Sequence, residues 1–592
     1  MYAYDLPTTG SISFADFCQC AEDAPTTSAS QSASEDAEPE RESESGQAAR
    51  RRACARWIAE ATKARVDVRG VLKALRHGGG GGSGGDYGYD DEGEWGGGDY
   101  GEKGRDKGKG KGEKDWLGAV KVGFVIVLVL EEYLPLLYGI IMSVDNREIT
   151  FKSMPVFSWR PTLSATPTLS ISASPARLSL PTLHSELAFV LLTYALAQAN
   201  HTRVLVRALG AYERARTASE EDRKVGDAGL TRAVAGLCTA AGVLEALAEG
   251  VVPEWEKRFG ESMRGVGEGV DKRPVDLSRE VVAALAKTLL ADAQTLAIRK
   301  LLSKARWEET LTPGPPLPKS HPSPALIAKL HLECAALYSS ARGLVGAVGK
   351  RGASSGGGSN SGGLGLGKLK SSLKVGKTSS PQPHGQPNAP AGEVAPGLRR
   401  HLEREAMFHG AMGRKWLGVD AGEAGRCGEA VGFLAWAQRE LEELGGKSDR
   451  SSNAGMGISG GNHKEGVGQG GKGEKRAMIQ DEKESVGLFL RHYRKINDSI
   501  TFQGVLKQSE LATRIPAGRL AVSVRPWTPP RAAFELGRGA RESDDAKASG
   551  GSALRWSGSS GGGGGKGDES SSDDEGGGGG GGGSYAGAGS YF

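Results

Sequence analysis

Leu490-Arg-His-Tyr-Arg-Lys-Ile-Asn-Asp-Ser-Ile-Thr-Phe-Gln503 is the stretch that decides the fold, together with Ile515-Pro-Ala-Gly-Arg519 shortly after it. Both pieces are varied in composition, although glycine-rich blocks flank them. Apolar residues recur at helical spacing through the first piece, at Val486, Phe489, Leu490, Tyr493 and Ile496. The pattern becomes extended from Ser499 to Phe502. The stretch therefore predicts a last long helix that continues into a packed extended arm.

Glycine-rich and polar blocks interrupt the rest of the chain. The 592 residues include 91 glycines, and five blocks lack the apolar periodicity that would offset the entropy of ordering them. We expect disordered inserts at 21–50, 78–114, 349–396 and 446–475, and a disordered Gly/Ser-rich tail at 536–592. Long surface insertions cost little free energy, and each apolar segment stops where a block begins. We therefore expect one domain over 1–535.

Charge and cysteine content exclude several classes of protein. The formal net charge is +4, with 75 basic and 71 acidic residues, so no overall field favours nucleic acid or an anionic membrane. Six cysteines do not make a disulfide framework in a chain of this length, and we expect a reducing, cytoplasmic compartment. The N-terminal residues have no basic segment followed by an apolar core, so no secretory signal is predicted.

The segment 122–142 is the strongest candidate for a membrane span. Glu131 and Glu132 lie at its centre, where each acidic residue costs roughly 2.5–3.5 kcal/mol in a bilayer. Only Val122 to Leu130 is uninterrupted, which is far short of the roughly 20 residues that a span requires. We expect a buried core helix that is broken near Pro135, with a membrane anchor as the alternative.

From residue 183 onward the pattern is almost wholly helical. We expect helices at 183–216, 230–249, 277–306, 323–348, 397–417 and 423–444, before the closing helix. The clearest apolar stripe lies in 323–348, at Leu330, Cys334, Leu337, Ala341, Leu344 and Val348. Upstream, a helix is expected at 53–76, and the segments 148–151 and 155–159 alternate like a short hairpin. Consecutive antiparallel helices of this length predict a mainly α, solenoid-like body.

The sequence contains no convincing catalytic or metal-binding constellation. Gly352-Ala-Ser-Ser-Gly356 fits the nucleophile-elbow pattern, but no strand precedes it and no helix follows it. Cys18-Gln-Cys20 has no second ligand pair at metal-binding spacing. For His184 and Glu186, a capping or surface role explains the residues better than acid–base chemistry. We therefore predict that the protein is not an enzyme and uses no cofactor and no metal ion.

Several motifs, taken in order, resemble the Bro-domain family of fungal pH-response regulators. These are Leu6-Pro-Thr-Thr9, Trp159-Arg-Pro-Thr-Leu-Ser164, Leu183-His-Ser-Glu-Leu-Ala-Phe-Val-Leu-Leu-Thr-Tyr-Ala195 and the stretch quoted at the outset. Residues 289–300 resemble the Bro-domain helix with an Ala-x-Ala-Gln motif, and Ile327-Ala-Lys-Leu330 resembles the helix that follows it. The resemblance covers nearly all of the chain outside the glycine-rich blocks, although 53–145 matches weakly.

The resemblance implies a Bro domain, which is a curved stack of antiparallel helices with a small N-terminal β element. It also implies a cytoplasmic, non-enzymatic adaptor that binds the main ESCRT-III filament subunit and is recruited to cortical or endosomal membrane sites. There the alkaline-pH signal activates a protease that processes a transcription factor. No nucleic acid is expected as a partner, and membrane association is expected only through partners.

The resemblance further implies where the ESCRT-III subunit binds. In Bro domains an amphipathic C-terminal helix of that subunit lies in an apolar groove, in the helix-in-groove mode. Carried over residue by residue, the groove would be formed by Ile298 and Leu301 on one helix and by Leu330 and Leu337 on the next. For each of these residues, packing into the core is the alternative.

Two other functions remain open from the sequence. A Bro-domain scaffold could serve general endosomal and multivesicular-body sorting, and it would then bind a deubiquitinase or ubiquitinated cargo. A membrane protein anchored through 122–142 is the second. The run Ser570-Ser-Ser-Asp-Asp-Glu575 also resembles a site for an acidophilic kinase.

Overall fold

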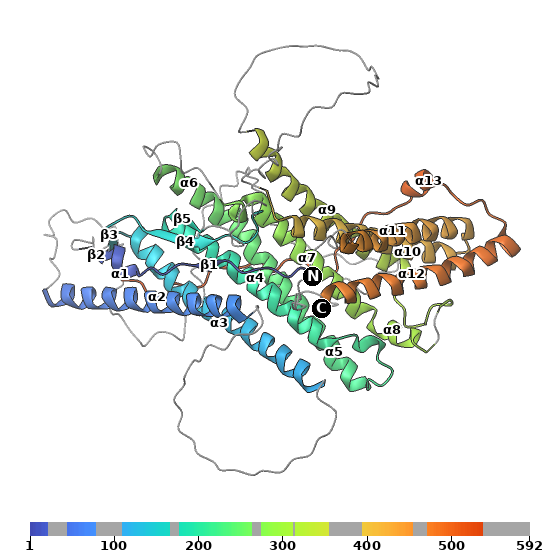
Figure 1. Cartoon of the computed structure of the whole chain (residues 1–592), viewed down its shortest axis with the longest axis horizontal. Coiled ribbons are helices and arrows are strands. Elements are labelled where there is room, and N and C mark those ends of the chain that lie inside the picture. The colour runs from blue at the N-terminus through green and yellow to red at the C-terminus, as the bar shows by residue number, and fades with distance from the viewer. Residues whose placement is uncertain are drawn as a thin grey trace, which may run out of the picture.

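The computed structural model describes residues 1–21, 44–78, 109–165, 177–262, 274–311, 314–354, 393–453 and 470–536. Long helices lie side by side and form an elongated body (Figure 1). They are α2 (Glu44–Gly78), α3 (Lys109–Asp145), α4 (Leu183–Leu209), α5 (Glu220–Ala246), α7 (Arg279–Leu301), α9 (Pro324–Ser354), α10 (Pro396–Glu423), α11 (Cys427–Asn453) and α12 (Gly470–Ile496).

Each long helix packs mainly against the long helix before it and the one after it, from α2 to α12. Shorter elements fill the connections: α1 (Phe14–Phe17), α6 (Val252–Ser262), α8 (Ser303–Glu309) and α13 (Gln508–Ala512). This order of contacts is that of a solenoid, so the mainly α, solenoid-like fold predicted from the sequence is confirmed. At the start of α7 the Ser278 hydroxyl accepts from the Val281 N–H and caps the helix.

The strands pair differently from the expected hairpin. In one sheet β4 (Val156–Arg160) lies between β1 (Thr8–Thr9) and β5 (Leu178–Pro181), and in the other β2 (Cys18–Cys20) pairs with β3 (Ile149–Phe151). All pairs are antiparallel. The hairpin expected between 148–151 and 155–159 is wrong, because the extended N-terminal residues supply a separate partner for each segment.

Two further expectations are corrected. Helix α3 runs through Pro135 without a break, although Pro135 offers no N–H to the helix; packing between α2 and α4 holds both halves in line. Cys20 and Cys54 are joined by a disulfide, which the expectation of reduced cysteines did not include. Strand β2 packs on α2 and brings their Cα atoms to 6.3 Å, which a disulfide can bridge.

The edges of the expected inserts belong to helices. Helix α2 already begins at Glu44 and α3 at Lys109, α9 extends to Ser354, α11 reaches Asn453, and α12 begins at Gly470. The remainder of these inserts, and the tail from 537 onward, lie outside the described residues.

Three described segments are long and apolar enough to cross a membrane, judged by length and composition alone. They are Gly123–Asp145, Glu220–Phe259 and Arg279–Leu301, and their most apolar windows are 56%, 61% and 83% buried within the fold. In the first of them, the Glu131 carboxylate accepts a hydrogen bond of 2.7 Å from the Tyr194 hydroxyl on α4. The segment 122–142 thus packs as a helix of the stack.

A buried ion pair joins α2 to α4. The Arg65 guanidinium lies 2.8 Å from the Glu186 carboxylate, and both side chains are almost fully buried. Trp159 Nε1 and the Tyr133 hydroxyl donate to the same carboxylate, at 2.7 and 3.1 Å. Arg65 also donates to the Thr9 hydroxyl at 2.5 Å. Helices α2, α3 and α4 and the small sheet therefore share one polar centre, and Glu186 has a structural role.

The extended backbone expected from Ser499 to Phe502 is wrong, because a π-helical turn over Asn497–Thr501 continues α12. The predicted arm begins after this turn and lies back across the stack. We call residues 503–536 the strap. It contacts one helix after another, through Gly428 and Gly432 on α11, Lys329 and Glu333 on α9, Gln294 on α7, Cys238 and Gly242 on α5, Pro135 and Gly139 on α3, and Trp57 on α2. At Gly242 a Cβ atom would collide with the Arg525 carbonyl, so glycine is required there for the close approach.

We predict that Glu186→Gln lowers the free energy of unfolding by about 3–5 kcal/mol, because it leaves the buried Arg65 charge without its partner. Urea denaturation followed by circular dichroism measures the change. The matched control is Glu60→Gln, which removes an exposed pair with Arg56 and should change stability by no more than about 1 kcal/mol. Equal, small effects in both variants would contradict a structural role for Glu186.

Candidate partner-binding face on helices α7 and α9

Helix α7 lies in the middle of the stack, between α5 and α9. Polar side chains cross from α7 to its neighbours. The Tyr338 hydroxyl on α9 donates to Asp292 at 2.7 Å, and the Thr295 hydroxyl lies 3.1 Å from a ring nitrogen of His409 on α10. These buried contacts fix the positions of three helices relative to one another.

Gln294 binds the strap to α7. Its side-chain N–H donates to the Arg519 carbonyl at 2.8 Å, and its side-chain oxygen accepts from the N–H groups of Ala521 and Val522 at 2.7 and 3.3 Å. On α9 the Lys329 carbonyl accepts from the Arg519 N–H at 3.1 Å. A Cβ atom on Gly518 would clash with Glu333, so the strap lies directly on α9.

The structure buries three of the four residues that the sequence assigned to a groove. Ile298, Leu330 and Leu337 are only 2%, 3% and 9% exposed and belong to the hydrophobic core. Leu301 is half-buried. The first three residues therefore pack into the core, as the alternative stated. Of the four, Leu301 alone is partly open to solvent.

The strap adds an exposed apolar side chain to the same region. Leu520 is 46% exposed and lies between two strap residues whose main chains bind Gln294. Gln294, Ile298 and Leu301 are spaced at i, i+4 and i+7 and lie on one side of α7. We define the α7–α9 face as these three residues, Leu330 and Leu337 on α9, and strap residues 519–522.

Sequence reasoning missed Gln294 and Leu520, although both had signals. Gln294 ends the Ala-x-Ala-Gln motif, and Leu520 follows Ile515-Pro-Ala-Gly-Arg519. The structure shows that these two motifs contact each other. Another motif is also anchored by a buried polar side chain. In Trp159–Ser164, the N–H groups of Thr162 and Leu163 donate to Asp276 at 2.7 and 2.9 Å.

Two buried histidines near the face are held neutral by burial. Desolvation lowers the pKa of His331 to about 3, and it lowers the pKa of His409 well below its usual range. The two rings are joined through their Nδ1 atoms at 2.9 Å. Within the described ranges, no three His, Cys, Asp or Glu side chains are grouped so that they could hold a metal ion. What the face offers a partner is apolar contact, through Leu301 and Leu520.

Comparison with known proteins gives a family and a relative. The family model described as "BRO1-like domain" matches residues 209–545, which contain α5 to α12 and the strap. The pH-response regulator protein palC of Cryptococcus neoformans var. neoformans serotype D (strain B-3501A) is 38% identical over 419 residues, covering 69% of this chain and 80% of the relative.

Two solved structures are similar to this chain, but with low sequence identity and a low TM-score. The ALIX BRO1 CHMP4C complex is 13% identical with a TM-score of 0.45, over 91% of this chain and 99% of that chain. The structure described as "Structure basis for endosomal targeting by the Bro1 domain" is 13% identical with a TM-score of 0.38, over 70% of this chain and 83% of that chain. The family model and the curated relative carry the argument, and these two likenesses do not.

We predict that Gln294→Ala frees the strap from α7 without unfolding the helices. The change removes three hydrogen bonds, each worth about 1 kcal/mol, so the N–H groups of Ala521 and Val522 should exchange with solvent faster. Hydrogen exchange read by mass spectrometry measures this. The control is Gln480→Ala, which removes an exposed side-chain hydrogen bond to Glu484 on α12. Unchanged hydrogen exchange at 519–522 would show that the Gln294 side chain does not hold the strap on α7; this set of hydrogen bonds is called the Gln294 clamp.

We predict that acid destabilises the protein through its buried histidines. The pKa values of His184 and His331 are lowered by desolvation from 6.5 to about 4 and about 3. Above pH 6.5 such a residue is neutral in both states. Below it the unfolded chain binds a proton that the folded chain excludes, so stability falls by about 1.4 kcal/mol per pH unit for each histidine.

Chemical denaturation between pH 4 and pH 7 measures this slope. His331→Gln should reduce the slope of stability against pH by the contribution of one histidine, about 1.4 kcal/mol per pH unit. His492→Gln, at an exposed position, should leave the slope unchanged. If His331→Gln leaves the slope unchanged, His331 does not contribute to the loss of stability in acid.

Proposed function

Because this chain belongs to the BRO1-like domain family, we propose that it is a non-enzymatic adaptor of fungal alkaline-pH signalling. The observation that carries the proposal is its 38% identity to a pH-response regulator protein, palC, across 80% of that relative. The accessible apolar side chains of Leu301 and Leu520 on the α7–α9 face support an adaptor that binds a partner by apolar contact.

The proposed partner is the main ESCRT-III filament subunit, bound through its C-terminal amphipathic helix at the α7–α9 face. A helix that docks in this mode needs a few apolar anchors on a rigid support. Leu301 and Leu520 provide accessible apolar side chains, and the Gln294 clamp holds the strap backbone beneath Leu520. Ile298 and Leu330 would support this surface from within the core.

Binding there would concentrate the adaptor on ESCRT-III filaments at cortical or endosomal membranes. The protein itself would remain cytoplasmic when it is not recruited. The long stack would then hold further pH-signalling components close to the filament, where the protease that processes the transcription factor becomes active. The rigidity of the stack suits such a platform, because the energy of binding is not spent on ordering it.

We predict that Leu301→Asp with Leu520→Asp weakens binding of a peptide of the ESCRT-III C-terminal helix at least tenfold, with circular dichroism and melting temperature little changed. Loss of one central apolar anchor costs about 2 kcal/mol or more. Fluorescence anisotropy of the labelled peptide measures binding. The same variant should fail to restore growth at alkaline pH to a deletion strain.

The matched control is Val225→Asp, which places the same charge on an exposed apolar residue of α5 outside the face. Ile298→Asp serves as the contrast. It buries an unpaired charge and should unfold the protein, so its loss of binding would not report on the surface. Full peptide binding by the Leu301/Leu520 variant would exclude this face, and growth at alkaline pH without the gene would exclude the pH function.

A further inference from the structure

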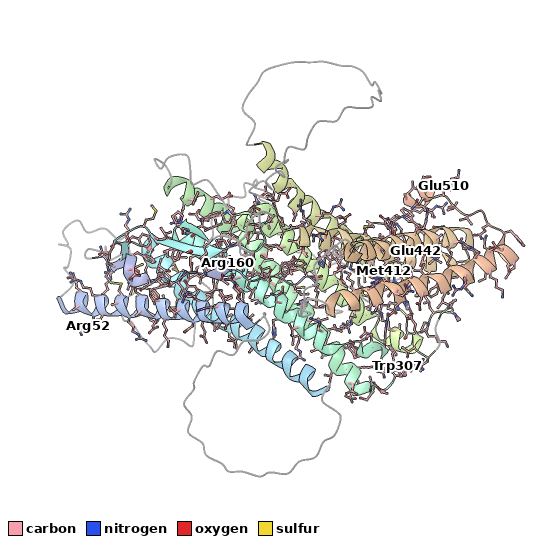
Figure 2. All side chains as sticks on the ribbon, viewed as in Figure 1. Arg52, Arg160, Trp307, Met412, Glu442 and Glu510 are labelled. Atoms are coloured by element: carbon pink, nitrogen blue, oxygen red, sulfur yellow. A yellow bond between two sulfur atoms is a disulfide. The ribbon has the colours of Figure 1, made fainter. Side chains whose placement is uncertain are left out.

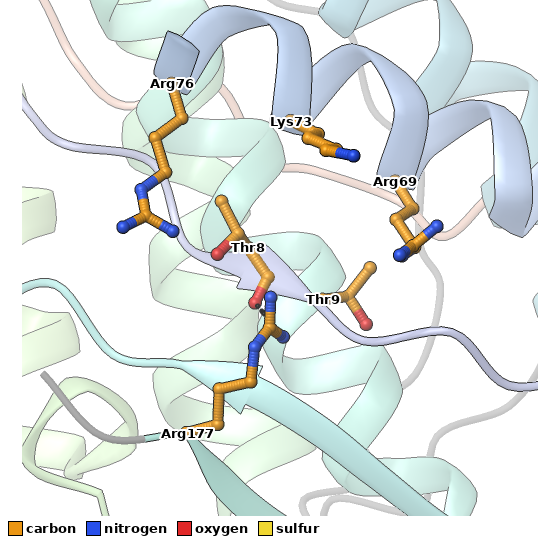
Figure 3. Close-up of a pocket in the computed structure, with 6 residues that line it drawn as sticks. All are labelled: Thr8, Thr9, Arg69, Lys73, Arg76 and Arg177. Carbon is orange, nitrogen blue, oxygen red and sulfur yellow. Dashed lines mark hydrogen bonds between the residues drawn. The ribbon is translucent and has the colours of Figure 1, made fainter. Parts of the chain in front are cut away.

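A small basic pocket lies between α2 and the sheet that contains β1, outside the region matched by the family model. It has a volume of about 140 Å³ and is lined by Thr8, Thr9, Arg69, Lys73, Arg76 and Arg177. Figure 3 shows the two threonines of β1 between the three cations of α2 on one side and Arg177 on the other. Arg160, which pairs with Thr8 across β1 and β4, is labelled in Figure 2 and marks this part of the molecule.

The cations come from a single stripe of α2. Arg65, Arg69, Lys73 and Arg76 follow at intervals of four, four and three residues, so they lie on one side of the helix. Arg65 is neutralised by Glu186 and fixes β1 through Thr9 and the Gly10 carbonyl. Arg69 and Lys73, on the next turns, make no ion pair with a described carboxylate.

Arg177 completes the pocket from the sheet side. Its guanidinium donates to the main-chain carbonyls of Thr8 and Ser158, at 3.3 and 3.4 Å. Within the described part of the chain, the charged side chains that act on it most strongly are both arginines. Desolvation lowers the pKa of Arg177, and the positive charges of Arg69 and Arg76 lower it further. The folded chain therefore holds several positive charges together against their repulsion.

Two buried donors at this place also lack partners. The Thr8 hydroxyl is buried, and no described group is hydrogen-bonded to it. The same holds for Nε of Arg160, the residue that pairs with Thr8 across β1 and β4. Buried polar groups without partners are uncommon and costly in folded proteins. An anion in the pocket would neutralise the cations and would accept from the Thr8 hydroxyl.

We propose that this pocket binds a phosphate group, carried either by an inositol lipid in a membrane or by a soluble inositol phosphate. A phosphate brings close to two negative charges and several acceptor oxygens at once, and arginine matches its geometry with paired N–H donors. A carboxylate offers one charge for the same space. The pocket is also too small and too local for a nucleic-acid backbone, which needs an extended basic track.

The test uses the full chain with two probes. One is soluble inositol hexakisphosphate, followed by titration calorimetry. The other is phosphatidylcholine vesicles containing a phosphatidylinositol bisphosphate, followed by co-sedimentation, with phosphatidylserine vesicles of equal charge as reference. Binding to the soluble probe identifies a free phosphate ligand, and binding only to the inositol-lipid vesicles identifies a headgroup. Either result supports the proposal.

Lys73→Glu with Arg177→Glu should lower the affinity by about fivefold or more for each cation replaced. The matched control is Lys63→Glu, an exposed lysine of α2 outside the pocket, which should retain binding. Thr8→Val should also weaken binding while leaving the melting temperature unchanged or raised, because it removes an unpartnered buried hydroxyl. A purely structural role for Thr8 would lower the melting temperature instead.

Three results would overturn the proposal. The first is an equal loss of binding in Lys63→Glu, which would indicate general attraction to charge. The second is equal binding to the phosphatidylserine vesicles. The third is an absence of binding to both phosphate probes, while Lys73→Glu changes only the stability. The cations would then have a structural role and would contact an acidic group of the chain itself. The ESCRT-III peptide is proposed to bind at the α7–α9 face, so failure of that proposal would leave these results unchanged.

Discussion

The strap is the interaction on which the rest of the structure depends. In a stack of helices, each helix contacts mainly its neighbours, and stability is a sum of local terms. The strap breaks this rule, because residues 503–536 touch α11, α9, α7, α5, α3 and α2 in turn. Its hydrogen bonds to Gln294 and its passage over Gly242 let distant helices support one another. The result is one cooperative body in place of a chain of independent hairpins.

Buried polar groups fix how the parts align. Glu186 gathers Arg65, Tyr133 and Trp159 from three other elements, and Asp276 holds the segment after β4. Removal of one partner from such a centre leaves a costly unpaired group. Apolar surfaces alone would tolerate a helix displaced by one turn, whereas these centres do not. The motifs that reveal the family are, in large part, the motifs that hold this alignment.

Apolar periodicity was sufficient to predict the fold class, the order of the long helices from α4 to α12 and the packed arm. It was not sufficient for the candidate site. Ile298 and Leu301 belong to one stripe of α7, but only the position of the strap and of α9 decides that Ile298 is buried and Leu301 is partly open. Strand partners and the Arg65–Glu186 pair, 121 residues apart, depend equally on tertiary packing. Gln294 could have been found, because a glutamine on an otherwise buried helix needs partners of its own.

The strap also has a consequence for synthesis of the chain. Phe534 stacks on Trp57 of α2, with ring centroids 4.9 Å apart, and is itself buried. Translation adds roughly 5–20 residues per second, so α2 leaves the ribosome tens of seconds before its last contact exists. During that interval the surfaces of α3 and α5 that the strap will cover remain open to water. Apolar surface that stays open in this way favours aggregation of a nascent chain until its final segment has emerged.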